Sequence, residues 1–263
     1  MWLKKLKKKK LQCFLIGALL FLSSLIFTSS LSMLTSIEGY VNKFYSNDKF
    51  YDIICYNANE SSTNDVLKWG MRNSEVKDVK AIEAVTSGND LYHNGENLKI
   101  SMYDVVPIED SKSLPFGLTK GNSSNNDSCP KEGEVWITKI LAENHNIHLG
   151  DNLTIKTKTN DVTLKVSSLI NDSLQPSATI GTINLYTNKN SGQEFSSLRK
   201  TSLIFIDVKS GTNVANVEKD LTGAIKVGGF VVDKDLVILS STMASSMMGG
   251  IATLASILVF IVS

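Results

Sequence analysis

"GEVWITKILAENHNIHLGDNLTI", residues 133–155, is the stretch that decides how we interpret the fold. "GEVWI" is typical of a short strand, and "TKILAENHNI" predicts a helix whose first N–H groups are capped by Thr138. Gly150 can adopt a positive φ and end that helix, and Asp151 can cap the turn into the next strand. The stretch therefore predicts a strand, a helix, a tight turn and a second strand in close succession.

The residues on either side continue this mixed pattern of short strands and turns. After it, "LGDNLTIKTKTNDVTLKVSSLI" predicts a hairpin that turns at Thr159 to Asp161. Before it, Asn94-Gly95 lies between two alternating runs, which is the strongest short-range signal for a hairpin. The polar, turn-rich segment Leu114 to Gly133 predicts an exposed loop.

Further out, both ends of the central region predict strands and helices that belong together. "KFYDIICYN" (Lys49 to Asn57) is typical of a strand, and "STNDVLKWGMRN" predicts a short helix capped by Ser62, Thr63 or Asn64. Late in the chain, "SLIFIDVKSG", "TNVANVEKDLTGAI" and "GGFVVDKDLVI" predict a β-α-β unit. The helix of that unit has four apolar residues on one face: Val214, Val217, Leu221 and Ile225. We expect an α+β domain with residues 52–55 in the same sheet as 202–208 and 228–233.

Two windows without charge flank this central region, from Leu11 to Ile37 and from Leu236 to Ser263. Crossing ~30 Å of hydrocarbon takes about 20 mostly apolar helical residues. We expect transmembrane helix 1 at 11–37, with the basic residues 1–10 on the cytoplasmic side. The alternative is a signal peptide cut near "SSLSM", but its apolar core would run only about 7–15 residues.

The second window predicts transmembrane helix 2 at 241–263. From Gly249 it offers a rise of only about 22 Å at 1.5 Å per residue, so we expect a truncated span. The alternative, a buried C-terminal helix, predicts polar positions at helical spacing, and none lies between Ser256 and Ser263. The chain is thus expected to be the front portion of a longer membrane protein.

The distribution of charge excludes one functional class, and the absence of a motif excludes another. Six of the 27 Lys and Arg residues lie in the first ten positions, which leaves 21 against 26 Asp and Glu in the remainder. A nucleic-acid binder needs its basic residues spread over a folded face, which this mildly acidic region does not offer. No G-x-x-x-x-G-K-[ST] motif occurs, so the chain has no P-loop to hold ATP phosphates.

The stretch 133–155 resembles the extracytoplasmic domain of MacB/FtsX-type ABC transporter permeases. The residues that carry the resemblance are Glu134, Ala142, Leu149, Gly150 and Asp151. The order of the whole chain is also similar: a basic N-terminus, one span, about 200 outside residues with a late β-α-β unit, then a second span. The resemblance covers only the front of such a permease, which continues with an intracellular loop and two more spans.

The resemblance implies an extracytoplasmic domain at 38–240 with two subdomains, a membrane-proximal α/β part (about 38–90 and 187–240) and a strand-rich distal insert (about 91–186). It also implies a location in the cell membrane, a separate ATP-binding subunit, and a permease homodimer or heterodimer. Movement of the domain would serve export, lipoprotein or lipid handling, or control of a cell-wall enzyme. The alternatives are a two-span receptor with an outside sensing domain and, third, an anchored or secreted enzyme.

The sequence gives no catalytic, cofactor-binding or metal-binding assignment. His145 and His148 are spaced to meet on a helix face, but exposed polar residues at a helix end are the simpler interpretation. His93 receives no role. Cys55 and Cys129 are the only pair outside the predicted spans, and whether they form a disulfide stays open.

Overall fold

The computed structural model describes residues 51–123, 127–175, 183–236 and 239, together with ten helical positions between 14 and 32. The chain divides into two units, and the larger one, Asn47–Val237, contains the strands given below. Within the described residues, no helix is both long and apolar enough to cross a membrane. Most of the predicted span 11–37 and all of the predicted span 241–263 lie outside the described residues.

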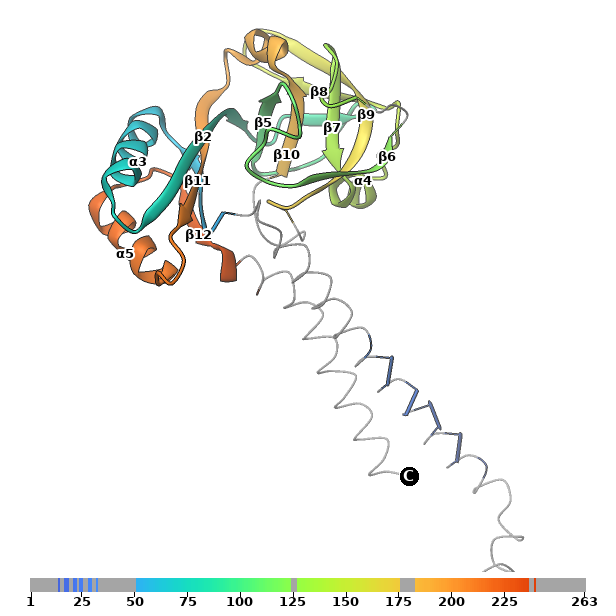
Figure 1. The fold of residues 1–263 in the computed structure, drawn as a ribbon. Coiled ribbons are helices and arrows are strands. Elements are labelled where there is room, and N and C mark those ends of the chain that lie inside the picture. The colour runs from blue at the N-terminus through green and yellow to red at the C-terminus, as the bar shows by residue number, and fades with distance from the viewer. Residues whose placement is uncertain are drawn as a thin grey trace, which may run out of the picture. The chain divides into compact units, whose positions relative to one another are not determined.

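The larger unit is an α+β domain rich in strands, as the sequence predicts (Figure 1). Its strands are β1 (Ile53–Ala58), β2 (Val76–Ser87), β3 (Leu91–His93), β4 (Glu96–Asn97), β5 (Tyr103–Ile108), β6 (Leu118–Ser123), β7 (Glu134–Thr138), β8 (Asn152–Lys156), β9 (Asp161–Asp172), β10 (Ile183–Asn188), β11 (Arg199–Val208) and β12 (Phe230–Asp233). Its helices are α3 (Glu60–Arg72), α4 (Lys139–His145), α5 (Val214–Ala224) and the 3₁₀ helix η1 (Lys189–Phe195).

The twelve described strands form one continuous sheet in the order β12-β1-β11-β2-β5-β10-β7-β9-β8-β3-β4, with β6 paired to β9. We call β1, β2, β11, β12, α3 and α5 the first lobe, and β3 to β10 with α4 the second lobe. Strand β2 belongs to both, because it pairs with β11 over most of its length and with β5 at its end. The two lobes are therefore parts of one sheet.

Each lobe has its own apolar core. The core of the first lobe combines early residues, Ile53 to Val76, with late ones, Ile204 to Val227. The buried residues of the second core lie between Leu91 and Phe195, and Val85 and Leu198 pack against them. The hydrophobic residues thus place the middle of the chain in one lobe and both ends of the domain in the other.

The predicted sheet of early and late strands is confirmed, because β1 pairs directly with β11 and with β12. The predicted β-α-β unit needs one correction: β11 and β12 are not neighbours, since β1 lies antiparallel between them. The crossover through α5 skips one strand position, and the first strand of the domain fills it. Early and late segments are thereby interleaved.

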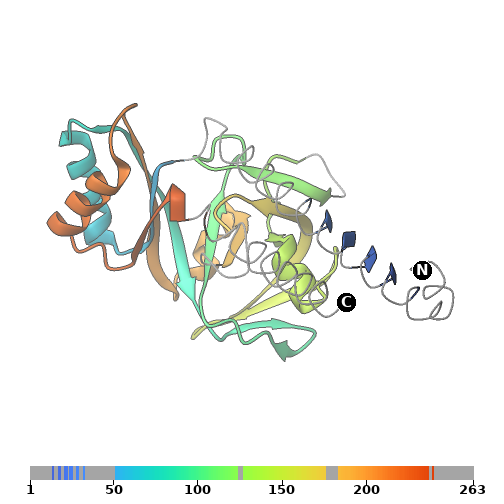
Figure 2. The same ribbon diagram turned by 90° about the horizontal axis from the view of Figure 1, so that it is seen from below.

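The helices α3 and α5 cover the same face of the first lobe and lie next to each other (Figure 2). Val217 and Leu221 of α5 are fully buried against β1 and β11, as their spacing predicts. Between the helices, the Asp220 carboxylate accepts hydrogen bonds from Trp69 Nε1 at 3.3 Å and from Asn73 Nδ2 at 3.2 Å. The helix pair thus links the beginning and the end of the domain a second time.

The predicted cap of α3 is wrong. The N-cap is Asn59, whose side chain accepts a hydrogen bond from the Ser62 N–H at 2.8 Å, so the helix begins before Ser62, Thr63 and Asn64. Ser62 is instead buried inside the helix, and its hydroxyl donates to the Lys226 carbonyl at 2.8 Å. A tertiary contact therefore takes the hydroxyl that the sequence pattern offers as a cap.

The loop predicted at 114–133 is only partly a loop, because it contains β6. This strand pairs with the second half of β9, while the first half of β9 pairs with β8. The long β9 offers an edge that the polar segment joins by strand pairing. Such pairing leaves no apolar pattern in the sequence.

Within residues 133–155, Thr138 caps α4 as predicted. Its side-chain oxygen accepts a hydrogen bond from the Leu141 N–H at 3.3 Å. Gly150 does not end this helix: the left-handed C-cap is Asn146, with φ of 52°. Gly150 has φ of 94° but lies in the turn before β8. Asn tolerates the left-handed conformation better than most residues, so it can replace the expected glycine.

Both predicted hairpins are confirmed. Strands β3 and β4 are joined through Asn94 and Gly95, whose φ angles of 49° and 83° suit a tight hairpin turn. Strands β8 and β9 are joined by a turn in which the Thr157 N–H donates to the Asn160 carbonyl at 3.0 Å.

Candidate functional site

The first and last residues of the described domain meet at one place. The Asp52 N–H donates to the Ile206 carbonyl at 3.1 Å, and the Asp52 carbonyl accepts from the Lys234 N–H at 2.8 Å. We call this place, with Tyr51, Asp52, Asp207, Val208 and Lys234, the terminal seam. It joins the chain that enters β1 to the chain that leaves β12, with the end of β11 beside them.

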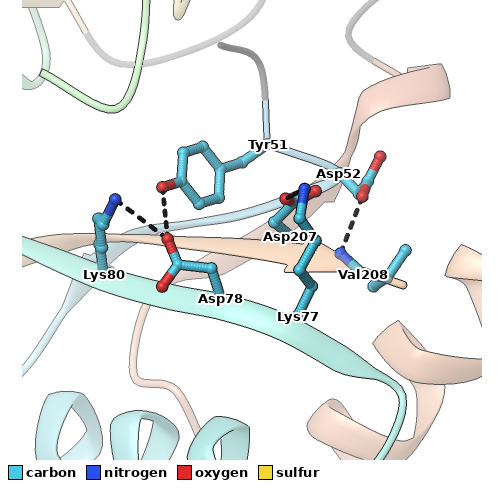
Figure 3. Close-up of polar contacts among 7 residues, drawn as sticks. All are labelled: Tyr51, Asp52, Lys77, Asp78, Lys80, Asp207 and Val208. Atoms are coloured by element: carbon cyan, nitrogen blue, oxygen red, sulfur yellow. Dashed lines mark hydrogen bonds and ion pairs between the residues drawn. The ribbon is translucent and has the colours of Figure 1, made fainter. Parts of the chain in front are cut away.

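Two carboxyl groups lie side by side in the terminal seam (Figure 3). Asp52 Oδ2 accepts from the Val208 N–H at 2.9 Å, and the register of Ile53 with Ile206 places Asp52 and Asp207 at the same end of the strand pair. Asp207 Oδ2 also forms an ion pair with Lys77 Nζ at 2.7 Å. Burial raises the pKa of Asp52; the Val208 N–H opposes that rise and the Asp207 carboxylate adds to it.

A second set of contacts holds Tyr51 against the sheet (Figure 3). Its hydroxyl donates to Asp78 Oδ2 at 3.0 Å, and Lys80 Nζ lies 3.0 Å from the same oxygen. Burial opposes ionisation of Asp78, but the hydrogen bonds from Lys80 and Tyr51 outweigh it and hold its pKa below the ordinary value. The Tyr51 ring also packs edge-on against Phe205, with centroids 5.6 Å apart. The entering chain is thus attached through both its backbone and its first aromatic side chain.

The terminal seam connects to the second lobe through four buried aromatic residues that we call the aromatic joint: Tyr56, Phe116, Tyr186 and Phe205. Phe116 comes from the second lobe and stacks on Phe205 of β11 at 5.4 Å, and it also contacts Tyr186 of β10 at 6.1 Å. The Tyr56 hydroxyl donates to the Leu174 carbonyl at 3.2 Å, which ties β1 to the loop after β9. The joint therefore packs the two lobes against each other beyond their shared sheet.

A buried carboxylate supports this joint. Asp172 accepts hydrogen bonds from the Tyr186 hydroxyl at 2.5 Å, from Asn184 Nδ2 at 2.9 Å and from the Leu174 N–H at 2.8 Å. Complete burial raises the pKa of Asp172, and these donors act against that rise. A buried charge is tolerated when donors surround it, so the network fixes the loop that Tyr56 contacts.

The histidines are placed differently from the pairing that their spacing suggests. His148 Nδ1 lies 3.8 Å from Asp151 Oδ2, and His93 Nε2 lies 3.0 Å from the same oxygen. His93 is almost buried and links the β3–β4 hairpin to the turn before β8. Among the described residues, no group of three or more His, Cys, Asp or Glu side chains is arranged to hold a metal ion.

Cys55 and Cys129 are free thiols in the structure. Cys55 lies in β1 and is completely buried, and burial, with a smaller contribution from Glu218, raises the pKa of its thiol to about 12. Cys129 is half-buried in a loop of the second lobe.

Sequence reasoning did not single out the residues of the terminal seam. Asp52 comes just before β1 and Asp207 is the second-last residue of β11, and an acidic residue at a strand end is ordinary. The available signal was the expected pairing of 52–55 with 202–208, which places these two acids at the same end of adjacent antiparallel strands.

No family model matches the chain, and no curated protein matches it in sequence. Several solved structures are similar to it in fold, and they include the following three. The periplasmic region of MacB from Actinobacillus actinomycetemcomitans has 13% identity and a TM-score of 0.38, over 76% of this chain and 97% of that one. A domain of a putative permease from Porphyromonas gingivalis has 10% identity and a TM-score of 0.36, over 72% and 89%. The extracellular domain of the noncanonic ABC-type transporter YknZ from Gram-positive bacteria has 12% identity and a TM-score of 0.32, over 69% and 99%.

Proposed function

We propose that the chain belongs to a permease subunit of a MacB/FtsX-like ABC system, with residues 38–240 outside the cytoplasm. A separate subunit hydrolyses ATP, and the permease passes the resulting motion to this domain without performing chemistry itself. The chain works as part of a permease pair in the cell membrane. The task is export, lipoprotein or lipid handling, or control of a cell-wall enzyme.

The observation that carries this proposal is the terminal seam. Asp52 is hydrogen-bonded through its backbone to both Ile206 and Lys234, so the domain begins and ends at adjacent positions. The two uncharged windows, 11–37 and 236–263, flank these same positions in the sequence. A domain that sits between two helices crossing one membrane needs adjacent ends, and this domain has them.

The connection between the lobes supports a mechanical role. Strand β2 runs through both lobes, and the aromatic joint with its buried carboxylate holds them together. A displacement applied at the terminal seam would then move the second lobe as a lever instead of being absorbed between the lobes. On this proposal the membrane-proximal part, about 38–90 and 187–240, contains the first lobe, and residues 91–186 form the distal insert.

The ATP-binding partner provides the test. The tagged full chain, purified in mild detergent from its own cells, is expected to retain a subunit that carries a P-loop and hydrolyses ATP. A parallel purification from cells that carry the untagged chain serves as the control for nonspecific capture. Recovery of a signalling protein in place of any nucleotide-binding subunit would contradict the permease role and favour the receptor.

A further inference from the structure

The two acids of the terminal seam are held close together by the strands that carry them. Asp52 precedes β1, and its backbone is bonded to Ile206, the neighbour of Asp207 in β11. The antiparallel register Ile53 to Ile206 then brings the Asp52 and Asp207 side chains to the same end of the strand pair. Their contact is a consequence of the sheet, so it persists as long as β1 and β11 are paired.

Among the described residues, the charges around Asp52 come from two further elements. Lys234, directly after β12, favours the ionised form of Asp52, and Lys77 of β2 is paired with Asp207. Asp78 of β2 pairs with Lys80 and accepts a hydrogen bond from the Tyr51 hydroxyl. The lysines reduce the repulsion between the two carboxylates, but Lys77 is mostly exposed, and exposed ion pairs are weak because water screens them.

Two adjacent carboxyl groups bind one proton more tightly than either would alone, because ionising both brings like charges together. Burial raises the pKa of Asp52, and Asp207 adds to that rise. The folded seam therefore holds a proton that the open chain releases near the ordinary value of 3.8. As pH increases from that value through the raised one, this proton is lost and the closed seam is destabilised.

We propose that Asp52 and Asp207 form a proton-sensitive lock on the terminal seam, which is closed most tightly when the two carboxyl groups share a proton. The same residue, Asp52, carries the backbone bonds to Ile206 and Lys234. Protonation of the pair therefore acts directly on the connection between the two ends of the domain. This lock depends only on the folded domain and holds whether or not the chain serves an ABC system.

The chain contains its own reporter of seam opening. Cys55 lies between β11 and β12, opposite Ile204 and Val231, and is completely buried. Its side chain packs in the core of the first lobe with Val66 of α3 and Val217 of α5, so a thiol reagent can reach it only when this lobe opens. Its rate of labelling therefore measures how often the first lobe, which contains the β1–β11 pair of the seam, opens.

The test uses the full chain in detergent micelles, with Cys13 and Cys129 replaced by Ser, and dithiodipyridine, which reacts with thiols at acidic pH. Labelling of Cys55 is measured from pH 4 to pH 8 with and without Asp207→Asn. The ratio of the two rates at each pH cancels the ionisation of the thiol itself. We expect this ratio, parent over Asp207→Asn, to increase at least threefold as the pH rises, and Asp52→Asn to remove the pH dependence in the same way.

Lys77→Met is the matched control, because it breaks the ion pair to Asp207 and leaves both carboxyl groups in place. Its labelling is expected to depend on pH at least as steeply as that of the parent. A ratio that stays constant from pH 4 to pH 8, or a Lys77→Met variant that behaves like Asp207→Asn, would overturn the lock. If Cys55 is never labelled, the thermal unfolding midpoints of the same variants decide: the parent must lose stability relative to Asp207→Asn as pH rises, and equal slopes would reject the proposal.

Discussion

Replacing Phe205 with Ala is expected to lower the free energy of unfolding by about 3–5 kcal/mol, the range for a large buried aromatic side chain. Phe205 is completely buried in β11 and contacts Tyr51 of the terminal seam and Phe116 of the second lobe. Its removal leaves a cavity where the entering chain, the first lobe and the second lobe meet. Denaturant unfolding of the full chain in micelles, followed by tryptophan fluorescence, measures the loss.

Phe230→Ala is the control for this prediction. Phe230 also stacks on an aromatic ring, that of Tyr56 at 4.8 Å, but it keeps 37% of its surface exposed on the edge strand β12. We expect it to cost only about 1 kcal/mol, because less surface is buried and no closed cavity forms. Equal losses in the two variants would mean that the aromatic joint does not connect the lobes as described.

Gly229→Ala is expected to destabilise the domain by about 3 kcal/mol through a steric clash. A Cβ atom at Gly229 would lie 1.8 Å from the Tyr56 carbonyl oxygen and 2.9 Å from the Asn57 carbonyl carbon. Both are backbone atoms of β1, so neither can rotate away as a side chain would. Strand β12 must therefore move off β1, which weakens the pairing that closes the terminal seam.

Replacing Gly223 with Ala should instead stabilise the domain. Gly223 lies in the last turn of α5, and a Cβ atom there would meet nothing within 4 Å. Alanine is favoured over glycine in a helix by about 0.8–1 kcal/mol, so Gly223→Ala should stabilise the domain by an amount up to that value. Unfolding curves for both variants check the pair, and destabilisation at both positions would contradict the description of α5.

Local sequence patterns predicted the elements whose causes are local. Asn94-Gly95 requires a tight turn whatever surrounds it, and Thr138 has the right spacing to cap α4. The predictions failed where a contact with a residue far away in the sequence decided what a side chain or segment does. Ser62 is bonded to Lys226 and so does not cap α3, and β6 joins the edge of β9 without an apolar pattern of its own.

The terminal seam also has one part that the sequence predicted and one part that it did not. The sequence predicted that 52–55 shares a sheet with 202–208 and 228–233, because both ends of a domain between two spans must meet. It did not predict that β1 lies between β11 and β12, because strand order depends on contacts between segments that are far apart in the sequence. The burial of Asp172 was equally hidden, because its donors, Tyr186, Asn184 and Leu174, follow it in a segment with no recognisable motif.

The orientation of the domain is the central claim of the proposed function, and labelling in spheroplasts tests it most directly. Two single-site variants are compared in a chain with Cys13 and Cys129 replaced by Ser: Ser128→Cys in an exposed position of the second lobe, and Lys5→Cys in the basic N-terminus. The buried Cys55 gives the background. With a membrane-impermeant maleimide, we expect Ser128→Cys to be labelled in intact spheroplasts and Lys5→Cys only after lysis, because the lysines stay inside. Labelling of Lys5→Cys in intact spheroplasts, with Ser128→Cys protected until lysis, would place the domain in the cytoplasm and contradict the account.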